Sequence, residues 1–209
     1  ISICRFSGEG WDRKSIVETE NKNIWASEEE MARRSAEIFE DGDFYLTHAE
    51  QEMVNTVKQN FARVIVVMNV GGMVDTSWFH DDAQIQSVLM AWQGGMEGGL
   101  ATAELLAGEG NPSGKLSDTF ARELNDYPST YNFHESEKYV EYTDDIYVGY
   151  RYFETIPGAK EKVNYPFGFG LSYTQFTLGE SQISIEGDQI RCMVSVTNTG
   201  AMAGKEVVQ

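Results

Sequence analysis

Cysteine and histidine are both scarce in this sequence of 209 residues. The only cysteines are Cys4 and Cys192, and two distant thiols cannot build the disulfide framework of a small secreted domain. The only histidines are His48, His80 and His134, which lack the short spacing that metal-binding motifs require. We therefore expect no intramolecular disulfide, no structural metal and no cofactor.

Basic residues are also scarce, because 16 Lys and Arg face 33 Asp and Glu, and the net charge at pH 7 is −17. Affinity for a phosphate backbone comes mainly from Lys and Arg, so we expect no nucleic-acid partner. No apolar run approaches the ~20 residues that a membrane-spanning helix needs, and no basic and apolar leader opens the chain. We expect no membrane partner; the oligomeric state stays open, and so does the compartment, with the cytoplasm favoured over secretion.

What is present is the composition of a globular protein, with 41% hydrophobic and 12% aromatic residues. Both ends of the sequence have strand patterns. Ile1 begins inside an apolar run, and the alternating pattern over 204–209 stops without a turn signal. We therefore expect the chain to be a piece of a longer protein.

The first half of the chain alternates helix and strand patterns. The capping box Thr47-His48-Ala49-Glu50 opens a predicted helix over 49–60, and an apolar run predicts a strand over 63–70 that is buried on both faces. The alternation repeats as a strand over 87–92 and a helix over 97–107. Such alternation predicts an α/β fold with a mostly parallel sheet sandwiched by helices.

A cluster of glycines over 94–99 lies between this second strand and helix. Amides at a helix N-terminus could hold a phosphate, so a nucleotide-binding protein is one hypothesis. The spacing fits neither G-x-G-x-x-G nor the phosphate-loop pattern, and no lysine follows the last glycine. Close packing of helix against strand is the favoured interpretation.

The later part of the sequence changes character. From Asn111 onward it is rich in aromatic residues and irregular, and then alternating patterns and the hairpin turn Glu186-Gly187-Asp188-Gln189 indicate an all-β module. We predict an α/β domain over 1–125, an aromatic connecting segment over 126–174 and the start of the β module over 175–209.

The most informative motif is Ser7-Gly8-Glu9-Gly10, which directly follows the opening apolar run. Two glycines permit tight turns and close approaches, and loops at the carboxyl ends of strands form the usual ligand edge of α/β sheets. Glu9 is therefore a candidate general acid or base. The alternative is a tight turn that carries a solvated glutamate.

Six ordered blocks together resemble glycoside hydrolase family 3, the β-glucosidase-like enzymes, over essentially the whole chain. The blocks are Ser7-Gly8-Glu9-Gly10-Trp11-Asp12-Arg13, Asn69-Val70-Gly71-Gly72 with Asp75-Thr76-Ser77-Trp78, Gly94-Gly95-Met96-Glu97-Gly98-Gly99, Asn111-Pro112-Ser113-Gly114-Lys115-Leu116, Ile146-Tyr147-Val148-Gly149-Tyr150-Arg151-Tyr152 and Tyr165-Pro166-Phe167-Gly168-Phe169-Gly170-Leu171-Ser172-Tyr173.

The resemblance implies an enzyme with an N-terminal barrel, an α/β sandwich and a fibronectin type III-like module, of which this chain holds the later sandwich and the start of the β module. It implies that Glu9 is the general acid/base, while the nucleophilic aspartate belongs to the barrel. The implied substrate is a β-glucoside or a short β-linked oligosaccharide, with a β-xyloside or another β-glycoside as the alternative. This chain alone is expected to be inactive because it carries one of the two carboxylates.

Other residues of the first block have supporting roles in this hypothesis. Ser7 and Trp11 are candidate substrate contacts, whereas Gly8, Gly10, Asp12 and Arg13 are expected to shape and hold the loop. Later in the chain, Asp75 and Trp78 are predicted to be structural, and so are the aromatic residues near Tyr147.

One block departs from the family pattern. Asp144-Asp145-Ile146 stands where Glu-Gly-Ile is more typical, which puts the local backbone conformation in question. A different functional class also stays open, in which the chain is a non-catalytic module whose aromatic segment binds carbohydrate or a partner protein.

Overall fold

The computed structural model describes residues 1–5, 37–132 and 138–208. The chain forms two compact units, each built from two separate segments. Unit 1 contains Ile1–Gly98 and Asp118–Pro166, and unit 2 contains Gly99–Ser117 and Phe167–Gln209. The domain limits predicted at residues 125 and 174 stay predictions.

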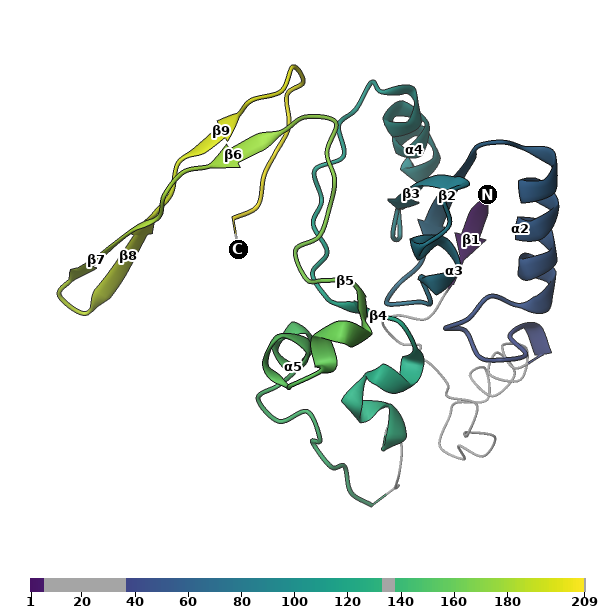
Figure 1. Cartoon of the computed structure of the whole chain (residues 1–209), viewed down its shortest axis with the longest axis horizontal. Helices are drawn as coiled ribbons and strands as arrows, with labels where there is room; N and C mark the ends of the chain where they lie inside the picture. Colours follow the sequence, from purple (N-terminus) through teal and green to yellow (C-terminus); the bar gives the residue numbers. More distant parts are fainter. Residues whose placement is uncertain (6–36, 133–137, 209) are drawn as a thin grey trace. The chain divides into compact units, whose positions relative to one another are not determined.

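Unit 1 is organised by a parallel sheet of three strands (Figure 1). The strands are β1 (Ser2–Cys4), β2 (Val64–Asn69) and β3 (Ile85–Met90), in the order β1-β2-β3. In the register, Ile3 pairs with Met68 and Val67 pairs with Leu89. The predicted parallel sheet is confirmed, although β3 starts and ends two residues earlier than expected.

The central strand β2 is buried on one face only. Val64, Val66 and Met68 are buried, whereas Ile65 on the opposite face is 44% exposed. The prediction of burial on both faces is therefore wrong for the described residues. A continuous apolar run does not say how much of each face other elements cover, because coverage is a property of tertiary packing.

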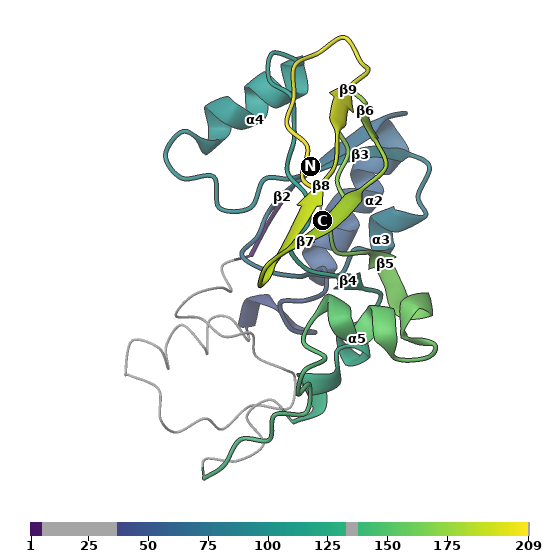
Figure 2. The same cartoon turned by 90° about the vertical axis from the view of Figure 1, so that its left-hand side faces the viewer.

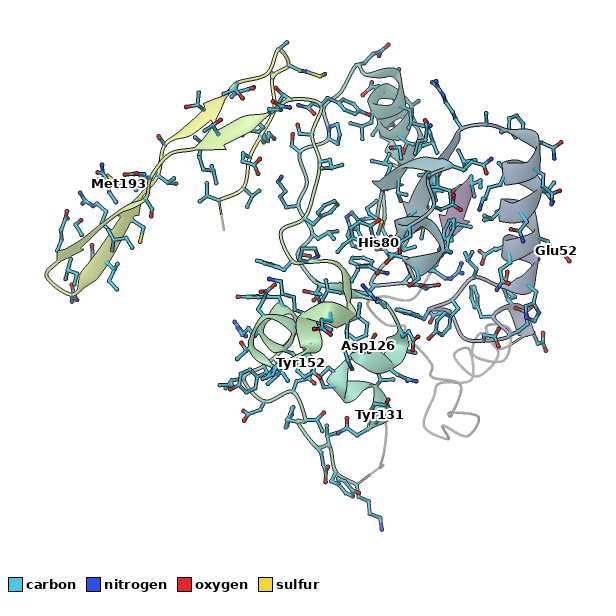
Figure 3. The ribbon with its side chains drawn as sticks, viewed as in Figure 1. Glu52, His80, Asp126, Tyr131, Tyr152 and Met193 are labelled. Atoms are coloured by element: carbon cyan, nitrogen blue, oxygen red, sulfur yellow. The ribbon has the colours of Figure 1, made fainter. Side chains whose placement is uncertain are left out.

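Helix α2 (His48–Asn60) lies beside this sheet (Figures 1 and 2) and buries Val54. It begins one residue earlier than predicted, directly after Thr47, whose side chain accepts a hydrogen bond from the backbone N–H of Glu50 at 3.2 Å. Figure 3 shows the exposed Glu52 directed away from the helix. A short helix α3 (Ser77–His80) follows β2 and buries Phe79.

The rest of unit 1 is a small antiparallel ladder with short helices around an aromatic core. The ladder pairs β4 (Phe120–Ala121) with β5 (Val163–Tyr165). Between these strands lie short helical segments: η1 (Leu124–Asp126), η2 (Pro128–Tyr131), α5 (Tyr150–Thr155) and η3 (Ala159–Lys162). The aromatic segment is thus less irregular than the sequence indicated.

Phe153 on α5 is the centre of this core. It is 2% exposed and packs with Ala121 and Ala159. The Tyr127 ring meets the Phe153 ring edge-on at 5.7 Å, and the Tyr152 ring, labelled on α5 in Figure 3, does so at 5.2 Å. Aromatic residues in this segment therefore hold the fold together, as predicted for Tyr152.

The departure from the family pattern at Asp145 has a clear backbone consequence. Asp145 adopts a left-handed conformation with φ of 47°. Glycine reaches this region freely, and aspartate is among the few other residues that tolerate it. The turn therefore keeps a conformation that suits the glycine of the typical pattern.

Unit 2 contains a helix and four antiparallel strands. Helix α4 (Gly98–Ala107) ends at Gly108, whose φ of 78° places it in the left-handed region. The strands pair as β6 (Phe176–Leu178) with β9 (Val196–Asn198), and β7 (Gln182–Glu186) with β8 (Gln189–Met193). The predicted hairpin turn at Glu186-Gly187-Asp188-Gln189 is confirmed.

Asn111 ties the segments of unit 2 together. Its side-chain amide donates to the carbonyl oxygen of Ala203 at 2.9 Å, and its Oδ1 accepts from Ser172 Oγ at 2.9 Å and from the Tyr173 N–H at 2.8 Å. A side chain on Gly170 could not fit, because a Cβ there would lie 2.3 Å from the carbonyl oxygen of Gly114. The Asn111-Pro112-Ser113-Gly114-Lys115 block is thus structural in unit 2.

The glycine cluster over 94–99 contains a close backbone contact. A Cβ on Gly94 would lie 2.8 Å from Cα of Gly98, so a larger residue would force the turn open. Close packing therefore accounts for this glycine without a bound phosphate. Within the described ranges, every helix is too short or too polar to span a membrane.

Candidate functional site

The residues that the sequence singles out for chemistry lie outside the described residues. These are Ser7, Gly8, Glu9, Gly10, Trp11, Asp12 and Arg13. The described residue nearest to them in the chain is Arg5, which directly follows β1. The backbone N–H of Arg5 donates to the carbonyl oxygen of Asn69 at 2.9 Å. This hydrogen bond extends the pairing of β1 with β2 to the carboxyl edge of the sheet. Ligands usually bind at this edge of an α/β sheet.

Arg5 is buried and all five of its side-chain N–H donors are used. Nε donates to the carbonyl oxygen of Asp43 at 2.8 Å, and the two terminal nitrogens donate to the carbonyl oxygens of Cys4 at 2.7 Å and Tyr45 at 2.8 Å. The two remaining donors reach the Glu50 carboxylate at 2.8 Å and 2.7 Å. A guanidinium has five donors, so this one is fully satisfied.

The surroundings of Arg5 exclude water. Its side chain is 2% exposed, and its guanidinium carbon lies 4.7 Å from the ring centroid of the buried Phe39. A buried charge is costly unless it is paired and hydrogen-bonded, and the contacts of Arg5 meet both conditions. We call the arrangement of Arg5, Glu50 and the carbonyl groups of Asp43 and Tyr45 the Arg5 clamp.

Glu50 both binds Arg5 and caps helix α2. Its carboxylate binds Arg5 and also accepts a hydrogen bond from the Thr47 N–H at 2.9 Å, which completes the capping box of α2. Burial raises the pKa of Glu50, but the hydrogen bonds from Arg5 and Thr47 and the charge of Arg5 outweigh it, and the pKa lies below its usual 4.5. The ionised form is therefore the form that the fold stabilises.

This lowered pKa predicts a loss of stability in acid. The contribution of Glu50 should be fully present above about pH 4.5 and should disappear as the pH falls through the lowered value in the folded state. Glu50→Gln should therefore cost about 1–3 kcal/mol near pH 7 and progressively less below pH 4.5. Melting temperatures measured between pH 3.5 and 7 test this expectation.

The matched control is Glu52→Gln, because Glu52 is exposed on the same helix. This variant should melt like the unsubstituted protein at every pH. A constant difference between Glu50→Gln and the unsubstituted protein over the whole pH range would contradict a role for the Glu50 charge.

Trp92 also lies beyond the carboxyl end of β3, two residues after Met90. Its φ of 51° is left-handed, which is an outlier for a bulky residue and costs about 1–3 kcal/mol. Its side chain is 36% exposed, and its ring centroid lies 6.2 Å from that of Phe120. No local sequence pattern shows that a tryptophan holds a positive φ, so the sequence did not predict Trp92 as a residue of this edge.

The block that contains Asp75 and Trp78 has structural contacts. Trp78 Nε1 donates to the carbonyl oxygen of Asp75 at 3.1 Å, and Asp75 Oδ1 accepts from the Ser77 N–H at 2.8 Å. Burial raises the pKa of Asp75, and the neighbouring charge of Glu123 acts in the same direction. These contacts agree with the predicted structural role of both residues.

A polar cluster, buried at Thr76 and Asn164, joins this block to β5. Asn164 Nδ2 donates to Thr76 Oγ1 at 3.0 Å and to Ser77 Oγ at 3.1 Å. Ser77 Oγ in turn donates to the carbonyl oxygen of Arg122 at 3.0 Å. This cluster holds the segment after β2 against the antiparallel ladder, which stiffens the carboxyl edge.

The histidines, cysteines and carboxylates of the described residues are dispersed. Among residues 1–5, 37–132 and 138–208, no group of three or more His, Cys, Asp or Glu side chains could hold a metal ion. Cys4 and Cys192 are both free and exposed.

The chain matches one known protein family over most of its length. The family model described as the glycosyl hydrolase family 3 C-terminal domain matches residues 5–173. The chain belongs to glycoside hydrolase family 3. The match begins at Arg5 and contains the whole segment with Glu9.

Two curated relatives of the chain are named as β-glucosidases. The chain is 60% identical to Beta-glucosidase A of Butyrivibrio fibrisolvens, over 100% of this chain and 27% of the relative. It is 45% identical to a β-glucosidase of Ruminococcus albus, over 80% of this chain and 17% of the relative. The chain therefore spans about a quarter of these relatives or less.

Solved structures of the family have the same fold. A β-glucosidase from Paenibacillus barengoltzii is 39% identical with a TM-score of 0.75, covering 96% of this chain and 20% of that one. β-Glucosidase 3B from Thermotoga neapolitana, solved in complex with glucose, is 35% identical with a TM-score of 0.74, covering 95% of this chain and 25% of that one.

Proposed function

We propose that this chain supplies the general acid/base, Glu9, of a retaining β-glucosidase. The observation that carries the proposal is the family match over residues 5–173, which includes the Ser7-Gly8-Glu9-Gly10 motif. The identity of 60% to a protein named Beta-glucosidase A supports the same activity. Because the chain spans only a part of that relative, the activity belongs to a longer polypeptide, which we call the complete enzyme.

In the proposed mechanism, one carboxyl group is the nucleophile and a second is the general acid/base. An aspartate on a barrel outside this chain attacks the anomeric carbon, while Glu9 donates a proton to the departing glycosidic oxygen. Glu9 then removes a proton from the water that releases the sugar. A retaining glycosidase needs its two carboxyl groups about 5–5.5 Å apart, so the loop that carries Glu9 must reach the barrel.

The proposed role of Glu9 requires that its protonation state change between the two steps. The carboxyl group must begin protonated, and we expect partial burial and the neighbouring aspartate to raise its pKa. Once the aspartate is consumed as a glycosyl ester, its negative charge disappears and the pKa of Glu9 should fall. One residue can then act as acid in the first step and as base in the second.

Two finer features belong to the same proposal. We propose that helices cover both faces of the β1-β2-β3 sheet in the complete enzyme, since Ile65 on one face is 44% exposed here.

We also propose that β6 to β9 begin a fibronectin type III-like module. Ile183, Ile185 and Ile190 are 69–77% exposed in the β7–β8 hairpin, and isolated two-stranded hairpins are marginally stable, so further strands should cover them.

The stereochemistry of hydrolysis tests the proposed activity. The complete enzyme should release β-glucose first from 4-nitrophenyl β-D-glucoside, because two successive displacements retain the configuration. Proton NMR spectra recorded within minutes distinguish β-glucose from α-glucose before the anomers equilibrate. First appearance of α-glucose would exclude the two-step mechanism, and faster cleavage of 4-nitrophenyl β-D-xyloside would point to xylosides as substrates.

A further inference from the structure

We propose that Arg5 and Glu50 are positioning residues for Glu9. This inference rests on the proposed function of Glu9 and adds the described residues that hold the chain on either side of it. Arg5 precedes Glu9 by four positions in the sequence. Since an extended chain spans at most about 3.6 Å per residue, only a short length of chain separates the anchored Arg5 from the proposed acid/base.

The Arg5 clamp holds both ends of the segment that contains Glu9. Arg5 itself lies at the start of that segment, and its position is set by the sheet hydrogen bond to Asn69. The carbonyl groups of Asp43 and Tyr45, which Arg5 binds at 2.8 Å, lie where the chain returns before α2. One side chain thus joins position 5 of the chain to positions 43 and 45.

Glu50 connects the same clamp to helix α2. It binds two nitrogens of Arg5 in a bidentate pair, and its capping box holds the first turn of the helix. A bidentate pair fixes orientation as well as distance. The end of β1, the returning chain and the helix are therefore joined through one guanidinium.

The clamp needs arginine rather than any cation. Lysine has three donors on a single nitrogen, whereas Arg5 uses five donors that point to four different groups. Arg5→Lys should keep the charge beside Glu50 but release the carbonyl groups of Asp43 and Tyr45. The ends of the segment would then be held less tightly, while the ion pair could persist.

Looser anchoring should affect proton donation first. A misplacement of about 1 Å can slow an enzyme by about 10²-fold, because a general acid must stay within hydrogen-bond reach of the departing oxygen. Dinitrophenolate leaves without a proton, whereas phenolate depends on one. The value of kcat/KM for phenyl β-D-glucoside should therefore respond to the clamp more than the value for 2,4-dinitrophenyl β-D-glucoside.

The experiment compares these two substrates in the complete enzyme. Arg5→Lys should lower kcat/KM for phenyl β-D-glucoside about 10- to 100-fold and for the dinitrophenyl substrate less than about 3-fold. Glu50→Gln should show the same split, at about 3- to 30-fold for the phenyl substrate. Glu50→Gln keeps the shape of the side chain, so this variant can test the inference if Arg5→Lys does not fold.

The matched control is Lys58→Gln, at the other end of α2. Lys58 pairs with Asp82, and both side chains are partly buried, at 28% and 20% exposure. Lys58 donates to Asp82 Oδ2, and Asp82 Oδ1 accepts from the Gln84 N–H at 3.0 Å, so the described contacts of this ion pair are separate from the Arg5 clamp. Lys58→Gln should change kcat/KM for the two substrates by the same factor, because a smaller folded fraction affects both equally.

The outcomes separate this inference from the proposed function. If Glu9→Ala gives a large split between the substrates and the clamp variants give none, the clamp only stabilises the fold and the inference is wrong. If Glu9→Ala itself gives no split, the acid/base role of Glu9 is wrong. A split in Lys58→Gln as large as in Arg5→Lys would also overturn the inference, since remote destabilisation would then explain it.

Discussion

Glu9→Ala in the complete enzyme should lower kcat/KM for phenyl β-D-glucoside by about 10²- to 10⁴-fold, the usual contribution of a general acid. The value for 2,4-dinitrophenyl β-D-glucoside should change little, since this leaving group departs as a stable anion. The glycosyl ester should then accumulate, because water lacks the base that activates it. Steady-state rates with the two substrates give the kcat/KM values. A pre-steady-state burst of dinitrophenolate measures the accumulation of the glycosyl ester.

Azide should restore turnover of the Glu9→Ala variant. Azide is an anion that needs no base, so it can displace the aspartate from the anomeric carbon and form β-glucosyl azide with the retained configuration. Glu52→Ala is the control, since Glu52 is an exposed carboxylate on α2 and should leave both kcat/KM values unchanged. Normal activity of Glu9→Ala on cellobiose, or failure of azide to form the glycosyl azide, would refute the assignment.

Phe153→Ala should produce the largest loss of local stability. Phe153 is 2% exposed between Ala121, Ala159 and two tyrosine rings, so its removal leaves a cavity that the short elements around it cannot easily fill. Removal of a buried phenylalanine costs about 3–5 kcal/mol. Hydrogen exchange in peptides that cover 120–131 and 150–165 should accelerate by about 10²-fold or more, as the free energy of local opening falls.

Phe61→Ala is the matched control for this prediction. It makes the same chemical change at a side chain that is 62% exposed, and it keeps the backbone N–H that bonds to the carbonyl oxygen of Val57. Exchange in the peptides around Phe153 should stay unchanged in this variant. Equal acceleration in the two variants would show that the aromatic cluster is not a separate source of stability.

Local signals in the sequence were sufficient for several elements of the fold. The capping box at Thr47 located the start of α2 within one residue, and the β-branched run after Arg63 located β2. The hairpin turn at Gly187 was also predicted, since its φ of 68° is a conformation that glycine takes without strain. These features depend on residues that are close in sequence, which is why a pattern reveals them.

Features that depend on distant residues were missed or wrong. Glu50 was recognised as a capping residue, but its partner Arg5 lies 45 positions earlier, and no local pattern connects them. The one available signal was the charge of Arg5 beside a buried strand, because such a charge must find a partner. The burial of β2 was misjudged for the same reason, since it depends on what covers each face.

The sequence alone determined the family, through six blocks in a characteristic order, and with it the candidate Glu9. It also determined the alternation of helix and strand, because backbone propensities and hydrophobic periods act over short distances. Only the tertiary structure decided that a single buried arginine joins the end of β1 to the returning chain and to α2. The physical reason is that a buried guanidinium is stable only where folding brings its acceptors together, and those acceptors lie far apart along the chain.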